Sequence, residues 1–244
     1  ICFERLGISD DSTIRYCEIS SKEDFPSVAL IGDSHSAVAF DGTSYYLKKE
    51  HNLTTLNLGG RLFGNVINHP KGNDFEIGVY KGGFEVADYL ESNKNISTIV
   101  MVSRGHHYFG KNRVFHIPNK PYLTDKREVF YEGLKDLLKR FGDRKIIFVL
   151  ENPNLNFDPR NCGPQRPINL FSKKCSITRN EDESTHKDYV KRTKEFLRSY
   201  KNVIVVDPRD VLCDDAKCYA SKGGRVLYAD RNHLNASGSF IQGK

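Results

Sequence analysis

Five short runs rich in β-branched and other apolar residues are spread along the chain, and they constrain its fold more than any other feature. They cover Val28–Ile31, Leu53–Leu58, Ile99–Val102, Ile146–Leu150 and Val203–Val206. These runs are largely continuous rather than alternating between apolar and polar residues. That pattern is typical of parallel strands covered on both faces, so it predicts a buried parallel sheet of about five strands.

Amphipathic helices are predicted between these runs. Apolar residues repeat at the helical spacing from Phe130 to Phe141 and again from Tyr189 to Tyr200. Gly142 follows the first series and is expected to end that helix. Strands that alternate with helices predict an α/β domain, a three-layer sandwich with helices on both faces of the sheet. In such a domain, ligands bind at the carboxyl ends of the strands.

The chain of 244 residues is long enough for one large domain or two small ones. Residues 1–25 are polar and irregular, and we interpret them as an N-terminal extension or linker before a domain over residues 26–244. The sequence starts at Ile1, and its one methionine is Met101. We therefore expect it to be part of a longer protein, with a targeting or membrane segment upstream.

Two irregular stretches interrupt the alternation of strands and helices. Residues 152–182 are rich in proline, asparagine, lysine and arginine, and residues 211–229 form the second stretch. The first is too long for a plain connection. We predict that it forms a braced loop over the functional edge of the sheet.

The composition is that of a globular domain in water. Hydrophobic residues make up 38% of the chain and charged residues 28%. No run of about 18 apolar residues is present that would span a bilayer. The net charge is +6, but the basic residues are interspersed with acidic ones and form no long basic block. The sequence therefore predicts no nucleic-acid partner.

The six cysteines fall into three local pairs. The pairs are Cys2 with Cys17, Cys162 with Cys175, and Cys213 with Cys218. None has the C-x-x-C spacing, and no histidine lies at zinc-finger distance, so no metal site is predicted from them. An even number in loop-rich surroundings favours three disulfides, which implies an oxidising compartment. Proximity alone selects this pairing, and six free thiols are the alternative.

The stretch from Gly32 to His35 directly follows the first apolar run. A serine in this place, Ser34, would lie at the carboxyl edge of the sheet and at the start of a helix, where the helix dipole favours developing negative charge. Gly32 allows a tight turn before it. The alternative is that Asp33 or Ser34 merely caps the helix. A serine hydroxyl becomes a strong nucleophile only when a base removes its proton, so this motif needs a partner elsewhere in the chain.

A base is available near the other end of the chain, where Asp230 and His233 are three residues apart. On one helical turn, this spacing places a carboxylate and an imidazole on the same face. The carboxylate would then orient the ring and stabilise its protonated form, leaving the second ring nitrogen for Ser34. The alternative is that Asp230 caps a short helix that begins near His233, with the histidine incidental.

Two blocks together resemble a known family. IGDSHS at residues 31–36 and DRNHL at residues 230–234 look like the SGNH (GDSL-type) hydrolase superfamily, which has a flavodoxin-like α/β fold and a Ser-His-Asp triad. The matching triad residues are Ser34, Asp230 and His233. The histidine after the serine and the paired cysteines resemble one branch. This is the periplasmic SGNH domain fused to the membrane-embedded acyltransferase-3 domain in bacterial O-acetyltransferases.

The resemblance also implies an oxyanion hole. Its expected donors are the amides of Ser34 and of a glycine after the second strand, where Gly59, Gly60 and Gly64 stand. We expect Gly60 to donate and Gly59 to be a further contact. A turn made of glycines is the alternative.

The superfamily has an asparagine after the third strand as another donor. This chain has VMVSRGHHYFG there instead. Arg104, His106 or His107 could serve in its place, and we single out Arg104 and His107 as candidate oxyanion or substrate contacts.

By the same resemblance, the chain is expected to be an acyltransferase that passes an acetyl group from a serine ester to lipopolysaccharide or a similar envelope glycan. The acetyl group would come from acetyl-CoA through a transmembrane acyltransferase-3 domain of the same polypeptide. The chain itself would be a periplasmic domain of an inner-membrane protein that binds no metal and no cofactor. Two alternatives stay open, a carbohydrate acetylesterase with the same triad and a glycan-binding module without activity.

Overall fold

The computed structural model describes residues 2–60, 67–68, 74–109, 115–117, 119–163 and 174–244. Its strands are β1 (Tyr16–Ile19), β2 (Val28–Gly32), β3 (Thr55–Gly59), β4 (Ile67–Asn68), β5 (Thr98–Val102), β6 (Phe115–His116), β7 (Lys145–Val149), β8 (Ser176–Thr178), β9 (Val203–Val206), β10 (Lys217–Tyr219), β11 (Ser221–Lys222) and β12 (Arg225–Val226). Its helices are α1 (Cys2–Leu6), α2 (Ser34–His51), α3 (Asp74–Ser92), α4 (Lys126–Phe141), α5 (Arg179–Leu197), α6 (Arg209–Leu212) and α7 (Ala236–Gln242). Two short 3-10 helices are η1 (Gly105–Phe109) and η2 (Pro159–Cys162).

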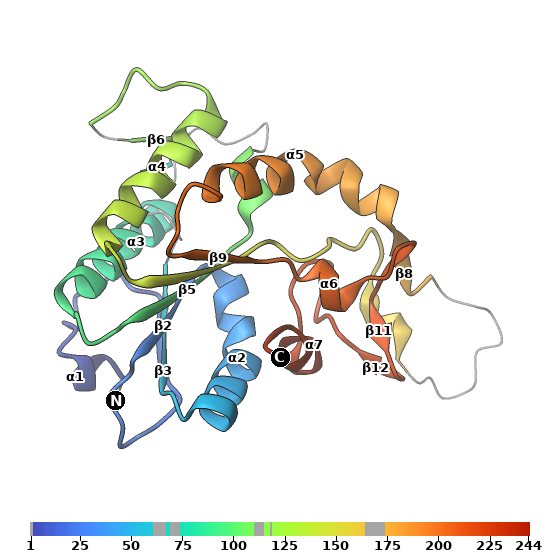
Figure 1. Ribbon diagram of the computed structural model, residues 1–244, viewed down its shortest axis with the longest axis horizontal. Helices are drawn as coiled ribbons and strands as arrows, with labels where there is room; N and C mark the ends of the chain where they lie inside the picture. The colour runs from blue at the N-terminus through green and yellow to red at the C-terminus, as the bar shows by residue number, and fades with distance from the viewer. Residues whose placement is uncertain (1, 61–66, 69–73, 110–114, 118, 164–173) are drawn as a thin grey trace.

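A six-stranded sheet in the order β1-β3-β2-β5-β7-β9 forms the centre of the molecule (Figure 1). Strands β3, β2, β5, β7 and β9 run parallel and coincide with the five apolar runs of the sequence, so the predicted α/β fold is confirmed. Strand β1 pairs antiparallel with β3 at the edge. Part of the segment that we interpreted as an extension is thus a strand of the sheet. Its four residues, YCEI, are too few and too mixed to reveal a strand by pattern.

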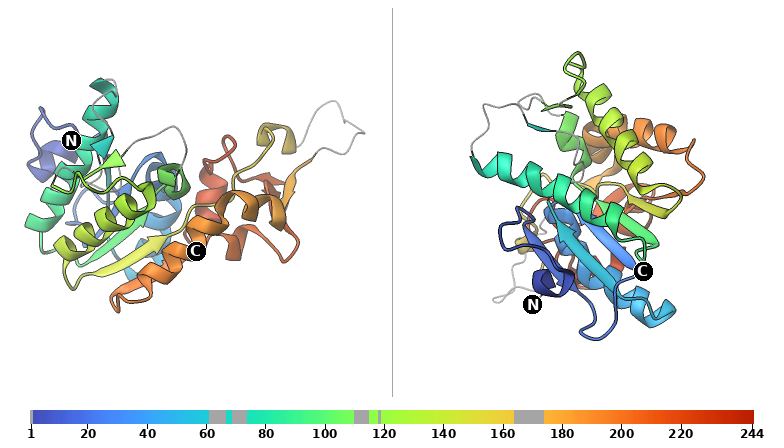
Figure 2. Two further views of the ribbon diagram at one scale, coloured as in Figure 1. Left: turned by 90° about the horizontal axis from the view of Figure 1, so that it is seen from above. Right: turned by 90° about the vertical axis from the view of Figure 1, so that its left-hand side faces the viewer.

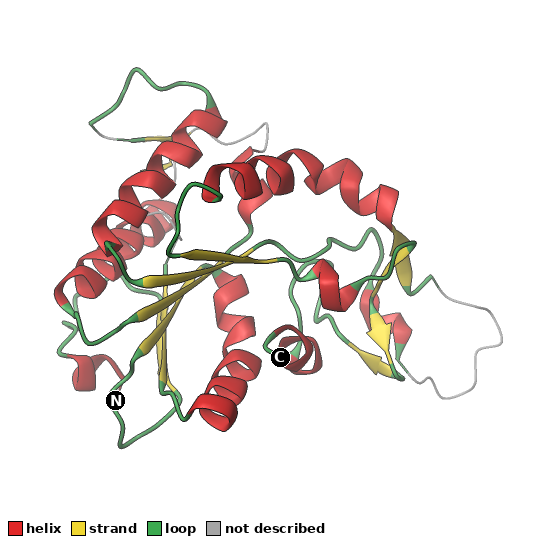
Figure 3. Ribbon diagram, viewed as in Figure 1, coloured by secondary structure: helices red, strands yellow, loops and turns green. Residues whose placement is uncertain are grey.

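Helices cover both faces of the sheet, because the strands are apolar on both faces (Figures 1 and 3). Alternate residues of β2 divide between two clusters of buried side chains. Ala29 and Ile31 lie in the cluster that includes residues of α3, α4 and α5, whereas Val28 and Leu30 pack with residues of α2. Each buried aliphatic side chain of this kind stabilises the fold by roughly 1.5–3 kcal/mol. The packing on both faces holds the carboxyl ends of the strands in fixed positions.

A smaller lobe extends from one end of the sheet (Figure 2, left). It contains η2 and two short antiparallel pairs, β8 with β10 and β11 with β12. Of the predicted loop over residues 152–182, the described parts, 152–163 and 174–182, include η2, β8 and the start of α5 at Arg179. Leu155, Ile177, Leu227, Tyr228 and Leu234 belong to a separate cluster of buried side chains in the lobe. This packing positions the turn that contains the second sequence motif.

All three predicted disulfides are present. They join Cys2 to Cys17, Cys162 to Cys175, and Cys213 to Cys218. The first connects α1 to the edge strand β1, and the other two lie in the smaller lobe. Among the helices that the structure describes, none has both the length and the apolar character needed to cross a membrane.

Candidate active site

Three neighbouring strands end level with one another at the carboxyl edge of the sheet. The last residues of β2, β5 and β7 pair in one row. Two residues beyond that row, the chain reaches Ser34, Arg104 and Glu151. Adjacent strands lie about 4.8 Å apart, so these three residues start side by side at one edge.

Ser34 is the first residue of α2, and its side chain is exposed. The residue before it, Asp33, caps the helix, because its Oδ1 accepts a hydrogen bond from the amide of His35 at 2.9 Å. Its other oxygen accepts from the amide of Arg104 at 3.0 Å. The buried Asp33 therefore joins the serine turn to the end of β5. Asp33 caps the helix, whereas Ser34 is exposed at the first position of the helix. Helix capping therefore does not exclude a role for Ser34 as a nucleophile.

Tyr16 of β1 also supports this turn, which the sequence pattern did not indicate. Its hydroxyl donates to the carbonyl of Asp33 and lies 2.6 Å from the hydroxyl of Ser36. Burial raises the pKa of Tyr16 well above its usual value, so the phenol stays neutral and able to donate. The edge strand thus fixes the backbone on which Ser34 stands.

The side chains of Ser34, His233 and Asp230 form a chain of hydrogen bonds. Ser34 Oγ lies 2.8 Å from His233 Nε2, and His233 Nδ1 lies 2.7 Å from Asp230 Oδ2. An ionised carboxylate can only accept, so Nδ1 donates to Asp230 and Nε2 is left to accept from the serine hydroxyl. The structure therefore brings together the three residues proposed from the sequence, in an arrangement suited to removing the serine proton.

The expected helical turn between Asp230 and His233 is absent, which corrects the sequence interpretation. The two residues lie in a turn of the smaller lobe, and α7 begins only at Ala236 with Asn235 as its cap. Asp230 Oδ1 accepts from the amides of Asn232 and His233, both at 2.8 Å. The carboxylate closes the turn through its own backbone, and this brings it to the ring three residues later.

The carboxylate of Asp230 is held in its charged form. Burial opposes ionisation, but the hydrogen bonds from the amides of His233 and Asn232 and from the His233 ring outweigh it and lower the pKa of Asp230 to about 2. An ionised carboxylate at Nδ1 stabilises the imidazolium that forms when His233 takes a proton. The geometry and the charge of this pair therefore fit a base.

A second histidine steadies the turn around His233. His35 is buried, its Nε2 lies 3.2 Å from Asn232 Oδ1, and its ring centroid lies 4.8 Å from that of His233. From the other side, Asn152 donates to the carbonyl of Asn232 at 2.7 Å. His35 thus links the serine block to the histidine block. The role of Asn232 and Asn152 had no signal in the local sequence pattern.

The two glycines proposed for the oxyanion hole are buried at the end of β3. The amide of Gly60 donates to the carbonyl of Gly32 at 3.1 Å, because the parallel pairing of β2 and β3 continues past the end of β3. Gly59 is buried against the ring of Tyr16. Both proposals are therefore corrected, while Gly64 lies outside the described residues. The amide of Ser34 has no acceptor among the residues that the structure describes, so it is available as a donor.

Arg104 is the residue that the structure places beside the serine turn. Its amide binds Asp33, and its Nε is buried 3.8 Å from Oε1 of Glu151. Its side chain is 36% exposed, and within the described part of the chain no hydrogen bond or ion pair engages its two terminal nitrogens. His107 lies in the same 3-10 helix, η1, half-buried, with its ring 6.5 Å from that of Tyr108. Of the two candidate contacts, Arg104 offers free donors.

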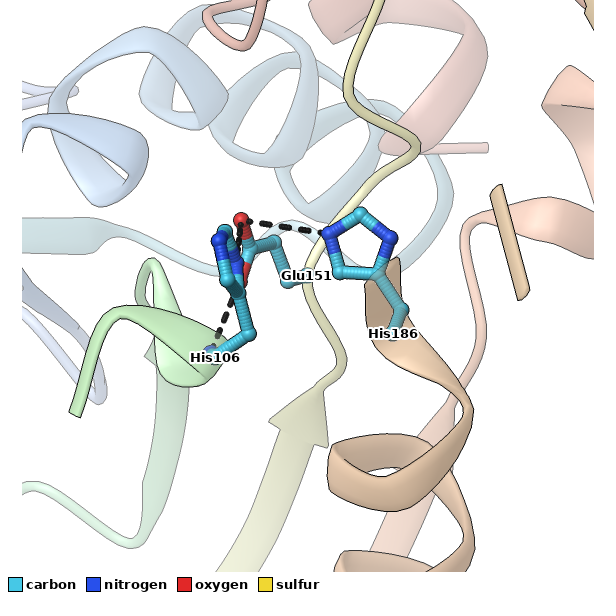
Figure 4. A group of neighbouring side chains, drawn as sticks. All are labelled: His106, Glu151 and His186. Atoms are coloured by element: carbon cyan, nitrogen blue, oxygen red, sulfur yellow. Dashed lines mark hydrogen bonds and ion pairs between the residues drawn. The ribbon is translucent and has the colours of Figure 1, made fainter. Parts of the chain in front are cut away.

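Next to Arg104, three side chains gather that could bind a cation. Donor atoms of His106, Glu151 and His186 all lie within 4.8 Å of one another, and this is the one such group found in the described ranges (Figure 4). The sequence pattern indicated no partner for His106, because Glu151 and His186 are far away in the chain and follow no ligand spacing.

Comparisons with known proteins bear on the family and the fold of the chain. A family model described as an SGNH domain fused to AT3 domains matches residues 2–241. The periplasmic domain of a lipopolysaccharide acetyltransferase of Salmonella ser. Paratyphi A superposes with a TM-score of 0.60 at 14% identity, covering 90% of this chain and 82% of that one. A structure described as a platelet activating factor from Streptococcus pneumonia gives 0.48 at 15% identity, covering 91% of this chain and 83% of that one. The second score is too low to establish a shared fold. No curated protein sequence matches the chain at a significant level.

Proposed function

The chain belongs to the family of SGNH domains fused to AT3 domains. From this premise we propose that it transfers an acetyl group, by way of an ester on Ser34, to a hydroxyl of a bacterial envelope glycan. The observation that supports this most is the hydrogen-bonded chain from Ser34 through His233 to Asp230. A serine with a base and an orienting carboxylate is the arrangement that acyl transfer requires.

In the first half of the reaction, His233 Nε2 takes the proton of the Ser34 hydroxyl as Oγ attacks the carbonyl carbon of the acetyl donor. The tetrahedral intermediate then collapses, and the leaving group departs with the proton from His233. Ser34 now carries the acetyl ester. Asp230 stays ionised throughout and stabilises the imidazolium.

In the second half, His233 Nε2 takes the proton of a glycan hydroxyl, and that oxygen attacks the carbonyl carbon of acetyl-Ser34. The bond to Ser34 Oγ breaks, and Oγ regains its proton from His233. Water in place of the glycan hydroxyl would make the same site an acetylesterase. The distinction therefore depends on which hydroxyl reaches the ester.

The oxyanion in both halves needs donors, and the corrected geometry offers two. The amide of Ser34 lies at the amino end of α2, where the helix dipole favours negative charge. The terminal nitrogens of Arg104 are the second source and would replace the asparagine that the superfamily uses. Loss of one such donor typically reduces the rate by about 10²–10³-fold, so a replacement donor would contribute substantially to catalysis.

The origin of the acetyl group is part of the proposal. Acetyl-CoA would supply it through the transmembrane acyltransferase-3 domain of the same polypeptide, as the family's fusion to AT3 domains suggests. The Salmonella neighbour is a periplasmic domain, and the three disulfides suit an oxidising compartment. We therefore place this chain on the periplasmic side of the inner membrane, where no metal or bound cofactor is required of it.

A polar hollow beside Asp230 suits the acceptor glycan. It has a volume of about 490 Å³ and is lined by Asp158, Pro159, Arg160, Ala229, Asp230, Arg231 and Asn232. Two arginines and two aspartates line the hollow, so their charges balance. These groups donate and accept hydrogen bonds, as binding of sugar hydroxyls requires. Its position next to the triad carboxylate would bring a bound sugar close to His233.

Replacing Arg231 with alanine is expected to raise the acceptor KM by roughly 10-fold or more, since one charge-assisted hydrogen bond stabilises a complex by about 1.5–3 kcal/mol. Hydrolysis of p-nitrophenyl acetate, which needs no acceptor, should be unchanged. Lys222→Ala, in a different surface hollow, is the control and should change neither value. Equal losses of transfer and hydrolysis in Arg231→Ala would contradict an acceptor role.

The proposed function is tested by trapping the ester. The purified chain is mixed with p-nitrophenyl acetate, and mass spectrometry of its peptides is expected to find one acetyl group on Ser34. Adding oligosaccharides from envelope glycans should then speed loss of this ester and yield O-acetylated sugar. An ester that water removes at a high rate, with no sugar product from any acceptor, would favour the acetylesterase. Acetylation only at lysines would contradict both.

A further inference from the structure

Glu151 is a fully buried carboxylate at the catalytic edge of the sheet (Figure 4). His106 approaches it twice, because its amide donates to Oε2 at 2.9 Å and its Nδ1 lies 2.7 Å from both oxygens. Asn154 donates to Oε1 at 3.4 Å. A buried charge is tolerated only when it is paired and hydrogen-bonded, and Glu151 meets that condition through residues from different loops.

Behind Glu151, a second layer of charged groups fixes its position. His186 Nε2 lies 3.6 Å from Glu151 Oε1, and His186 Nδ1 lies 2.8 Å from Asp182 Oδ1. Arg209 pairs with Asp182 and donates to the backbone carbonyl of Glu151 at 2.8 Å. Burial disfavours charge on His186, but the two carboxylates outweigh it and raise its pKa to about 9. Burial also opposes the charge on Glu151, but His106 and then His186 outweigh it and hold the pKa of this carboxyl below its usual range.

Arg104 forms an ion pair with Glu151, in which Nε lies 3.8 Å from Oε1. Nε is buried without a hydrogen-bond partner, so the charge of Glu151 is its one compensation among the described residues, while the side chain as a whole is 36% exposed. The backbone of Arg104 is tied to Asp33, the residue before Ser34. Arg104 is therefore held at its backbone by a hydrogen bond and attracted at Nε by the charge of Glu151, and its terminal nitrogens have no partner among the described residues.

We propose that Glu151 is a positioning residue, which holds the Arg104 guanidinium beside Ser34 so that its terminal nitrogens meet the acyl oxyanion. This inference rests on the proposed acyl transfer. A long arginine side chain loses rotamer freedom when it binds a ligand, and this loss costs free energy. A fixed anion next to Nε restricts the side chain before the substrate arrives, so less free energy is lost on binding. Because Glu151 is anchored by His106, His186 and Arg209, its carboxylate cannot follow Arg104 into solvent.

The same donors could in principle bind a divalent cation, but the surrounding charges oppose it. Arg104 already faces Glu151, and Arg209 already faces Asp182. His106 Nδ1 is occupied by its hydrogen bonds to Glu151. A dication would enter a group whose carboxylates are already compensated, which makes positioning of Arg104 the better account of the cluster.

A double-mutant cycle tests this proposal with p-nitrophenyl acetate as substrate. Arg104→Ala is expected to reduce kcat/KM for acetylation of Ser34 by roughly 10²-fold. Glu151→Gln, which keeps the shape but removes the charge, should reduce it by about 10-fold or more when Arg104 is present. In the Arg104→Ala background, the same Glu151→Gln change should cost less than about 3-fold, because there is no guanidinium left to position.

Controls separate this role from a merely structural one. Glu85→Gln removes a half-buried carboxylate that binds Ser12 and Thr13 far along α3, and it should lower thermal stability without changing kcat/KM. If Glu151→Gln does not fold, Glu151→Asp is the second variant, because its shorter side chain keeps the charge but moves it away from Arg104. It should reduce kcat/KM by less than Glu151→Gln does, and this reduction should disappear in the Arg104→Ala background.

Three results would overturn the positioning role. They are wild-type kcat/KM in folded Glu151→Gln, equal losses in both Arg104 backgrounds, and one equivalent of zinc in the purified chain that disappears in His186→Gln. Full activity in Ser34→Ala would instead contradict the acyl-transfer mechanism itself, so the two failures are distinguishable.

Discussion

Ser34→Ala is expected to reduce the rate of acetyl transfer by roughly 10⁶-fold, because the nucleophile that carries the acetyl group is lost. His233→Ala should cost nearly as much, since Ser34 then has no base. The double variant should be no slower than either single one, because the two residues act on the same proton and their effects do not add. The measurement is acetyl transfer and p-nitrophenyl acetate hydrolysis by purified variants, with thermal unfolding to show that each is folded.

Asp230→Asn extends this prediction, with an expected loss of about 10⁴-fold in kcat. The asparagine keeps the shape of the turn but cannot hold the charged partner that His233 needs. Because the pKa of Asp230 is lowered to about 2, its carboxylate is ionised at every pH above that value. A fall in activity on mild acidification therefore cannot come from protonation of Asp230.

Ser36→Ala is the matched control for this series. Ser36 is buried two residues after Ser34 and bonds to the hydroxyl of Tyr16, so its loss should affect stability more than chemistry. Retained activity in both Ser34→Ala and His233→Ala would show that the triad assignment is wrong. A loss confined to His233→Ala would show that another nucleophile uses this base.

Gly32→Ala is expected to prevent the chain from reaching its native fold. A Cβ at this residue would lie 1.7 Å from the carbonyl oxygen of Val102, and its backbone has a φ of +151°, which L side chains rarely adopt. Both atoms belong to paired strands at the centre of the sheet, so neither can move without breaking the ladder that holds Ser34 and Arg104 level. The expected loss exceeds about 4 kcal/mol, a large part of the roughly 5–15 kcal/mol that typically stabilises a domain.

The measurement is the yield of soluble protein and its unfolding in urea, followed by circular dichroism. Gly142→Ala is the control, because Gly142 also has a positive φ, +64°, but a Cβ added there would meet nothing within 4 Å. That variant should lose only about 1–2 kcal/mol, the cost of a left-handed backbone for an L-residue. Comparable stabilities for Gly32→Ala and Gly142→Ala would show that the close approach of β2 to β5 is wrong.

Much of this architecture could be predicted from short stretches of sequence. The five parallel strands and the helices α4 and α5 follow from patterns that span a few residues each, because burial on both faces or on one stripe leaves a local signature. The disulfide pairs were also near neighbours in sequence. The edge strand β1 was not predicted. Its four residues mix apolar and charged side chains, and they are extended because they pair with β3 rather than because of their composition.

Some residues of the candidate site could likewise be predicted from the sequence, and others could not. Ser34, Asp230 and His233 each stand in a recognisable block, but the expected helix between the latter two is a turn closed by Asp230 itself. The role of Gly60 was misjudged, because whether its amide is free for a ligand or bonded to a neighbouring strand is decided by how far the ladder continues. Tyr16 and Glu151 had no local signal at all.

The amino-acid sequence by itself determined the strands, the helices, the cysteine pairs and the two blocks that contain the serine and its base. Only the tertiary structure decided which side chains meet at the edge of the sheet. The register of β2, β5 and β7 sets Ser34, Arg104 and Glu151 in one row, and register is a property of long-range pairing that no window of sequence contains. The packing of the smaller lobe likewise carries His233 to Ser34 across 199 positions of the chain.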